Sequence, residues 1–148
     1  MLTIHAADTV RVTWDAEPLK DGAVAVDGTR IAAVAPLAEL TERFPTARVR
    51  HWPGTLGPGR VHAGPLPEAP SPRERVHAVL KLGAVAVLAE HAGTPELRAA
   101  AGRNDVAVLD RSRTPKITVA GRADLAVLDE TGACVATVCA GRLVHRRR

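Results

Sequence analysis

The segment that decides the fold is rich in glycine and proline and reads His51-Trp52-Pro53-Gly54-Thr55-Leu56-Gly57-Pro58-Gly59-Arg60-Val61-His62-Ala63-Gly64-Pro65-Leu66. The residues that lead into it, Val49 to Trp52, predict a short strand. Residues 65–72, which follow, hold four prolines in eight positions. So dense a run of prolines excludes a regular helix or a central strand. The segment therefore separates two parts of the chain that are built differently.

The part before this segment has the pattern of short strands. Residues 2–12 are rich in β-branched side chains and predict one or two strands. Residues 22–26 and 30–34 are apolar runs that flank Asp27-Gly28-Thr29. Asp-Gly between two such runs predicts a β-hairpin, because glycine accepts a positive φ without steric cost. Residues 36–44 predict a short helix that Pro45 ends.

The part after it alternates helices and strands. Ser71 as cap, Pro72 at the first position and Glu74 predict the start of a helix, and Gly83 predicts its end. Residues 84–89 form a continuous apolar run, which is typical of a buried strand. A second capped helix over 94–102 and a second apolar strand over 105–110 follow. Two such strands joined by a helix predict a parallel βαβ unit.

The last third returns to strands. Residues 116–119, 121–129, 134–139 and 142–145 each have a strand pattern, and the last two are predicted to pair around Ala140-Gly141. The chain as a whole is therefore predicted to have a mixed α/β fold.

Three stretches of the chain resemble the amidohydrolase superfamily, most closely its imidazolonepropionase-like and deaminase-like members. They are the hairpin over 21–34, the Pro58-Gly59 turn with the strand after it, and Gly121-Arg122-Ala123-Asp124-Leu125-Ala126-Val127-Leu128-Asp129 with the final hairpin. In that family the two ends of the chain form one composite β-sandwich beside a metal-binding barrel. The resemblance implies a composite β-sandwich from residues 1–64 plus 115–148, a Pro-rich linker over 65–70, and a truncated α/β insertion over 71–111 in place of the TIM barrel.

The same resemblance locates the metal site, and the ligands are missing from it. The family's first barrel strand ends in His-x-His, and those two positions here are Gly64 and Leu66. A complete barrel takes about 200 residues or more, and only some fifty lie between Pro65 and Pro115. Since a catalytic zinc needs roughly three protein ligands, we expect no family catalytic residue, no metal and no cofactor. The alternative candidate ligands are His62, Glu90 and His91, which lie near predicted strand ends.

Composition restricts the partners. The formal net charge is +4, and only 2% of residues are aromatic, which argues against a stacking surface for nucleic acid. No apolar run is long enough to span a membrane and no secretory signal is visible, so we expect a cytoplasmic protein. Cys134 and Cys139 lie an odd number of residues apart, which disfavours a disulfide within one strand. A homo-oligomer or a protein partner is expected to cover the surface that faces the barrel in relatives.

Three hypotheses about function remain open at this point. The leading one is a catalytically incomplete amidohydrolase relative, a pseudoenzyme that serves as a binding, scaffold or assembly module. The second is a metal-dependent hydrolase that acts on non-peptide carbon–nitrogen bonds, with a partner chain completing the site. The third is a small basic module for anionic ligands, with Arg48, Arg50, His51 and residues 146–148 as the binding groups.

Overall fold

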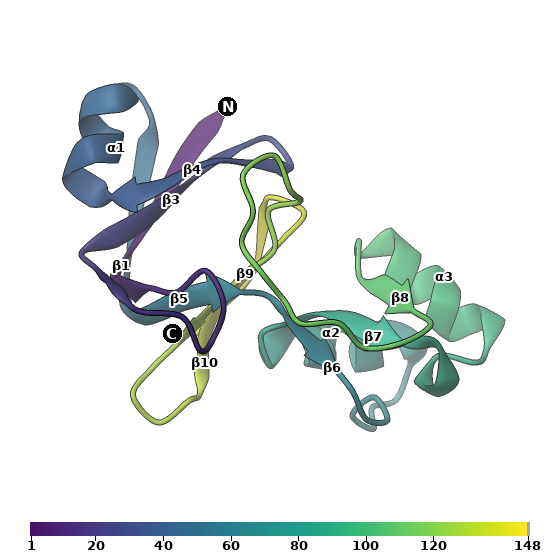
Figure 1. The fold of residues 1–148 in the computed structure, drawn as a ribbon. Helices are drawn as coiled ribbons and strands as arrows, with labels where there is room; N and C mark the ends of the chain where they lie inside the picture. The colour runs from purple at the N-terminus through teal and green to yellow at the C-terminus, as the bar shows by residue number, and fades with distance from the viewer. Residues whose placement is uncertain (148) are drawn as a thin grey trace.

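A computed structural model describes residues 1–147 and has the mixed α/β fold that the sequence predicts. The chain folds into two sheets and three α-helices within these residues (Figure 1). In chain order the elements are β1 (Leu2–Val10), β2 (Leu19–Lys20), β3 (Gly22–Asp27), β4 (Arg30–Pro36), α1 (Leu37–Arg43), β5 (Arg48–Pro58), β6 (Arg60–His62), α2 (Pro72–Lys81), β7 (Ala84–Leu88), the 3₁₀ turn η1 (Ala89–His91), α3 (Pro95–Arg103), β8 (Ala107–Leu109), β9 (Leu125–Leu128), β10 (Cys134–Cys139) and β11 (Arg142–Arg146).

The larger sheet joins the two ends of the chain. Its strand order is β11-β10-β9-β5-β1-β3-β4, with the short β2 paired to β1. The N-terminal part meets the C-terminal part where β5 pairs antiparallel with β9, from Thr55 opposite Leu128 to Pro58 opposite Leu125. The only parallel pair in this sheet, within the described residues, is β1 with β5. The sheet is therefore composite, as the resemblance implies.

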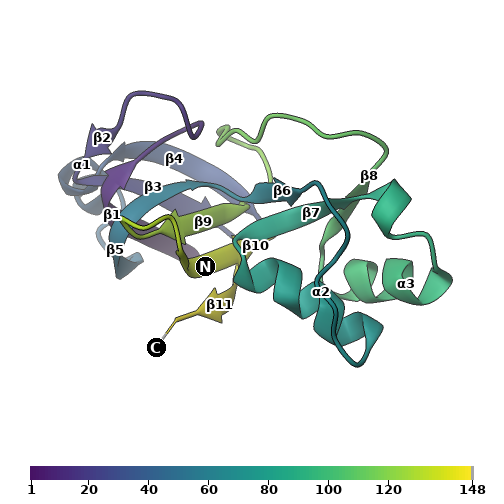
Figure 2. The same ribbon diagram turned by 90° about the horizontal axis from the view of Figure 1, so that it is seen from below.

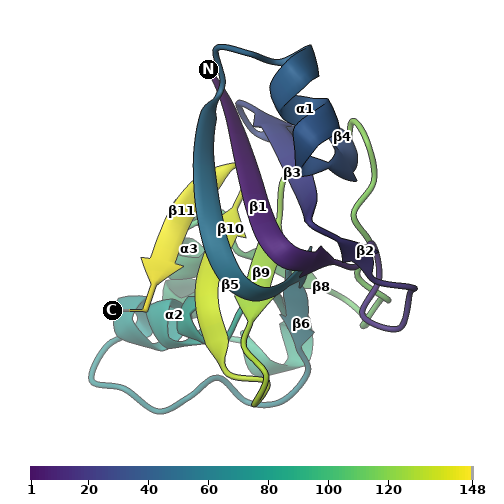
Figure 3. The ribbon, with the colours of Figure 1, turned by 90° about the vertical axis from the view of Figure 1, so that its left-hand side faces the viewer.

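This sheet curls until its two ends face each other, as Figure 3 shows. One apolar core draws on both ends, including Val24 and Ile31 from the first hairpin and Val127 and Val138 from the last strands. The free edge of β4 is closed by residues 120–123, because Ile31 donates its N–H to Gly121 and accepts one from Ala120 at 2.8–2.9 Å. The outer face of β1, β3 and β4 is covered by α1, whose Leu40 is fully buried there.

Strand β5 is longer than the sequence predicts, because Pro53-Gly54 does not break it. The pair Ala7–Trp52 is followed by Thr9–Thr55, so two residues of β5 oppose the single Asp8 of β1. This arrangement is a β-bulge. One of its residues has a positive φ, a conformation that glycine adopts without steric cost. Gly54 has φ +94°, and its N–H donates to the Asp8 carboxylate at 2.9 Å. A Cβ on Gly54 would lie 2.2 Å from the Leu128 carbonyl oxygen, so only glycine lets β5 reach β9.

The smaller sheet has three parallel strands in the order β6-β7-β8. The predicted parallel βαβ unit is confirmed as β7-α3-β8, and β6 adds a further strand. The predicted caps are also confirmed. Ser71 accepts the N–H of Glu74 at the start of α2, and Thr94 accepts that of Leu97 at the start of α3.

Helices α2 and α3 and the small sheet pack against β10 and β11, as Figure 2 shows. Cys139 and Val144 belong to the same apolar cluster as the buried side chains of α2 and α3. The buried Thr137 hydroxyl donates to the Leu80 carbonyl at 2.7 Å. The Pro-rich segment is held in place too, since Arg75 donates to the carbonyls of Leu66 and Pro67 at 3.0 and 3.2 Å.

Two strand predictions need correction. Residues 116–119 form no strand, because they run between different partners: Ile117 donates to Val12, whereas Ala120 donates to Ile31. The predicted strand over 121–129 shrinks to β9, since residues 120–123 close the β4 edge instead. No helix within residues 1–147 is long and apolar enough to cross a membrane.

Candidate functional site

We call the turn at Pro58-Gly59, where β5 leaves the larger sheet and β6 enters the smaller one, the hinge. After it come Gly64 and Leu66, the positions that the resemblance matches to the family's His-x-His, and they differ sharply in their surroundings. Gly64 is half-buried, and a Cβ built on it would meet no heavy atom within 4 Å. Leu66 is 2% exposed and packs into the apolar core beneath α2 and α3. One position is thus open space and the other is part of the core. His62, at the end of β6, places its Nε2 2.9 Å from the Pro65 carbonyl oxygen.

Glu90 and His91 lie in η1, directly after β7. Because β6 and β7 are parallel, His62 at the end of β6 and these two residues after β7 lie at the same edge of the small sheet. They nevertheless do not form a ligand set: across residues 1–147, no three His, Cys, Asp or Glu side chains are grouped so that they could hold a metal ion. The expectation that the chain binds no metal stays a prediction.

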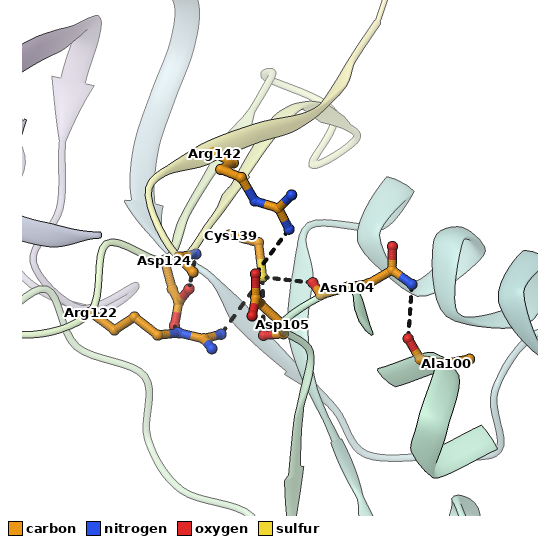
Figure 4. A network of polar contacts seen from close by, with 8 residues as sticks. Ala100, Asn104, Asp105, Arg122, Asp124, Cys139 and Arg142 are labelled. Atoms are coloured by element: carbon orange, nitrogen blue, oxygen red, sulfur yellow. Dashed lines mark hydrogen bonds and ion pairs between the residues drawn. The ribbon is translucent and has the colours of Figure 1, made fainter. Parts of the chain in front are cut away.

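A polar network joins the two sheets near the hinge (Figure 4). The Asp124 carboxylate accepts Nε of Arg122 at 2.7 Å and the N–H of Ala140 at 2.9 Å. The Cys139 thiol donates to the Asp105 carbonyl at 3.4 Å, and Asp105 pairs with Arg142 at 2.9 Å. These contacts tie the start of β9 and the last hairpin to the turn before β8.

The cysteine in this network is a packing group. Burial, followed by the nearby Asp124 carboxylate, raises the pKa of the Cys139 thiol to about 11. The thiol is therefore protonated at neutral pH, and the thiolate is the nucleophilic form of cysteine. Cys134 and Cys139 are both free thiols.

The structure brings together three of the basic residues that the sequence singles out. Arg48, Arg50 and Trp52 are every second residue along β5, so all three side chains lie on the same face of the sheet. Arg146 of β11 places its guanidinium carbon 5.8 Å from the centre of the Trp52 ring. Burial, followed by the charges of Arg48 and Arg146, lowers the pKa of Arg50. We call Arg48, Arg50 and Arg146 the arginine cluster.

The other predicted basic residues lie elsewhere. His51 alternates to the opposite face of β5. Arg147 pairs with Asp129 at 2.7 Å, and this contact, after the hydrogen bond from Thr131, lowers the pKa of the Asp129 carboxyl. Arg148 lies outside the described residues.

The structure adds one residue that the sequence did not single out. His5 pairs with Arg50 across β1 and β5, and its ring is stacked beside that of Trp52 with centroids 6.4 Å apart. Its Nδ1 accepts the indole N–H of Trp52 at 3.2 Å. Burial, followed by the charge of Arg50, lowers the pKa of His5 to about 4. His5 lies among β-branched residues in the sequence, and only the parallel pairing of β1 with β5 reveals its contacts.

The composite sheet and the parallel strands that follow it can be compared with known proteins. Residues 22–47 match the model of the imidazolonepropionase-like composite domain of bacteria. The predicted resemblance to a composite-domain fragment of the amidohydrolase superfamily is thereby confirmed. A search of curated protein sequences finds no match.

Solved structures with a similar fold include three deaminases. The guanine deaminase of E. coli covers 73% of this chain with 14% identity and a TM-score of 0.56. An adenosine deaminase from Xanthomonas campestris, solved with bound zinc, covers 72% with 21% identity and a TM-score of 0.55. The guanine deaminase of Bradyrhizobium japonicum covers 73% with 15% identity and a TM-score of 0.55. The match spans 35%, 33% and 34% of those chains respectively, so this chain spans about a third of their length.

Proposed function

We propose that this chain is a catalytically incomplete relative of the amidohydrolases that serves as a binding, scaffold or assembly module. The observation that carries the proposal is the contrast between Gly64 and Leu66. In the metal-binding members that the sequence resembles, these two positions supply the first two histidine ligands. Here one has no side chain, and the other fills the core under α2 and α3.

The shortage of barrel strands supports the same proposal. Strand β5 of the N-terminal part and strand β9 of the C-terminal part pair with each other in this one chain. The whole region between them is residues 59–124, and within it only β6, β7 and β8 are strands. A complete (β/α)₈ barrel requires about 200 residues or more. The missing strands are therefore an internal feature of the chain.

Metal content is the test of this proposal. The untagged protein, purified without added metal, is measured by elemental mass spectrometry and assayed for deaminase activity alone and after mixing with a full-length guanine deaminase. We expect essentially no zinc, iron or manganese and no gain of activity on mixing. Close to one metal per chain, lost in a His62→Ala/Glu90→Gln/His91→Ala variant, would instead establish the alternative function of a metal-dependent hydrolase of carbon–nitrogen bonds.

An assembly role would use the small sheet, and it belongs to the same proposal. Strands β6 and β8 each have a neighbour on one side only, β7. Unpaired strand edges are templates for pairing with another chain. Met1, Leu82 and Val119 are the only large apolar side chains exposed within residues 1–147, so the contact would be made by strand edges and polar groups. Native mass spectrometry at several concentrations would show a dimer or larger species if this is correct, and a monomer throughout would contradict it.

A further inference from the structure

The arginine cluster takes Arg48 and Arg50 from the first half of β5 and Arg146 from the end of β11. We propose that Arg48, Arg50 and Arg146 form a binding site for a phosphate group. This inference deepens the proposed function, on which it rests, because it gives the binding module a class of ligand.

The strands place the three side chains on one surface. Arg48, Arg50 and Trp52 share a face of β5 because side chains alternate along a strand. Trp52 belongs to the inner core of the curled sheet, so this is the concave face. Arg146 lies opposite the core residue Ala136 on β10 and extends over Trp52. The cluster therefore combines two separate strands at the rim of the core.

The charges of the cluster are not compensated within residues 1–147. The ion pairs in that part of the chain join Arg122 with Asp124, Arg142 with Asp105 and Arg147 with Asp129. None of them involves a member of the cluster. Both neighbours in the cluster repel the charge of Arg50 and, after burial, contribute to lowering its pKa. A bound dianion would relieve this repulsion, because like charges held close together destabilise each other's charged form.

Guanidinium chemistry selects the ligand. Arginine presents planar pairs of N–H donors that match the oxygens of a phosphate, and such charge-assisted bonds are among the strongest hydrogen bonds. Arg48 and Arg146 are exposed, whereas Trp52 is 8% exposed and its ring lies beneath Arg146. A nucleobase would therefore find no free ring on which to stack, which single-stranded nucleic-acid sites usually provide. The cluster fits a phosphate group on a small molecule or inorganic phosphate itself.

The two tryptophans of the chain provide a direct readout. The indole N–H of Trp52 donates to His5 beside the cluster, and that of Trp14 donates to the Pro58 carbonyl at the hinge. Inorganic phosphate is titrated into ¹⁵N-labelled protein at constant ionic strength, with chloride as the exchanged anion. We expect a saturable shift of the Trp52 indole signal and no shift of the Trp14 signal, the two being assigned with Trp14→Phe.

The decisive variant is Arg48→Gln/Arg50→Gln, which leaves the Arg146–Trp52 contact in place. Its control is Arg103→Gln/Arg111→Gln, which removes the same charge from exposed positions outside the cluster. Loss of two charge-assisted bonds should weaken phosphate binding at least about tenfold, and the control should weaken it less than about twofold.

Equal weakening in the two double variants, or no saturable shift, would overturn the proposal. Binding of a single-stranded oligonucleotide without binding of inorganic phosphate would also overturn it and indicate a nucleic-acid surface. Saturation by both inorganic phosphate and phenyl phosphate would support a site for the phosphate group itself. Each result is independent of metal content, so failure of this proposal and failure of the proposed function are separately visible.

Discussion

The two sheets of this chain differ in how their edge strands are covered. The eight-stranded sheet closes its β4 edge with residues 120–123 and covers its outer face with α1. The three-stranded sheet leaves β6 and β8 as outer strands and relies on packing against β10 and β11 for its position. The larger sheet thus protects the β4 edge with its own chain, whereas the smaller one keeps two unpaired edges and is held by contacts with the larger sheet. The predictions below test this difference.

The largest effect is expected from a histidine at position 66, which the resemblance matches to the family's second metal ligand. Leu66→His places an imidazole in the core under α2 and α3 and removes a buried aliphatic side chain. The free energy of unfolding should fall by about 4 kcal/mol. Gly64→His, two residues away in open space, should change it by less than about 0.5 kcal/mol. Urea denaturation measures both, and equal effects at the two positions would contradict the assignment of Leu66 to the core.

The larger sheet should be most sensitive at its bulge. Gly54→Ala introduces a Cβ at φ +94° against the Leu128 carbonyl, where β5 meets β9. Backbone strain and the clash together should cost about 3 kcal/mol. Gly132→Ala is the matched control, since Gly132 also has a positive φ but no heavy atom near its Cβ position. Its cost, measured by the same denaturation, should be clearly smaller.

Acid should destabilise the larger sheet through His5. Its pKa is about 4 in the folded chain and near 6.5 in the unfolded chain, so between these values the unfolded chain binds a proton that the folded chain does not. The free energy of unfolding is therefore unaffected by His5 above pH 6.5. It declines as the pH falls from there to about 4, by a total of about 3 kcal/mol. His5→Gln should flatten this part of the stability profile, whereas His51→Gln on the opposite face should leave it as in the wild type. An unchanged slope in His5→Gln would disprove the assignment.

The smallest effect concerns the contact between the larger sheet and α2. Thr137→Val removes the hydrogen bond to the Leu80 carbonyl. The cost should be about 1 kcal/mol, because Leu80 keeps a second donor in the N–H of Gly83. Amide hydrogen exchange should become faster in α2, with β1 and β3 unaffected. Thr46→Val, at an exposed position, serves as the control.

The elements that could be predicted from the sequence are those fixed by local chemistry. The Asp27-Gly28 hairpin and the helix starts at Ser71 and Thr94 follow from turn and cap residues, and all three are confirmed. The features that were missed depend on distant partners. The continuation of β5 through Gly54 requires Asp8 to accept an N–H across the bulge, and the absence of a strand over 116–119 reflects the closure of the β4 edge.

The candidate sites also combine features that the local sequence reveals with features that depend on distant residues. That positions 64 and 66 hold no histidine is visible in the sequence alone, but the burial of Leu66 is a property of the packed core. Composition suggested a basic surface that included His51 and the last three residues. Only strand alternation and the curl of the sheet select Arg48, Arg50 and Arg146 from that set and place them around Trp52.

The pairing of β5 with β9 also affects how the chain is made. Thr55 cannot pair with Leu128 until the ribosome has added Leu128, which is 73 residues later in the chain. At a synthesis rate of about 5–20 residues per second this delay is roughly 4–15 seconds. During that time the nascent chain carries Val24, Val26 and Trp52 without the C-terminal strands that cover them in the folded protein. The join that makes the sheet composite therefore leaves its apolar residues open to chaperones for seconds in each round of synthesis.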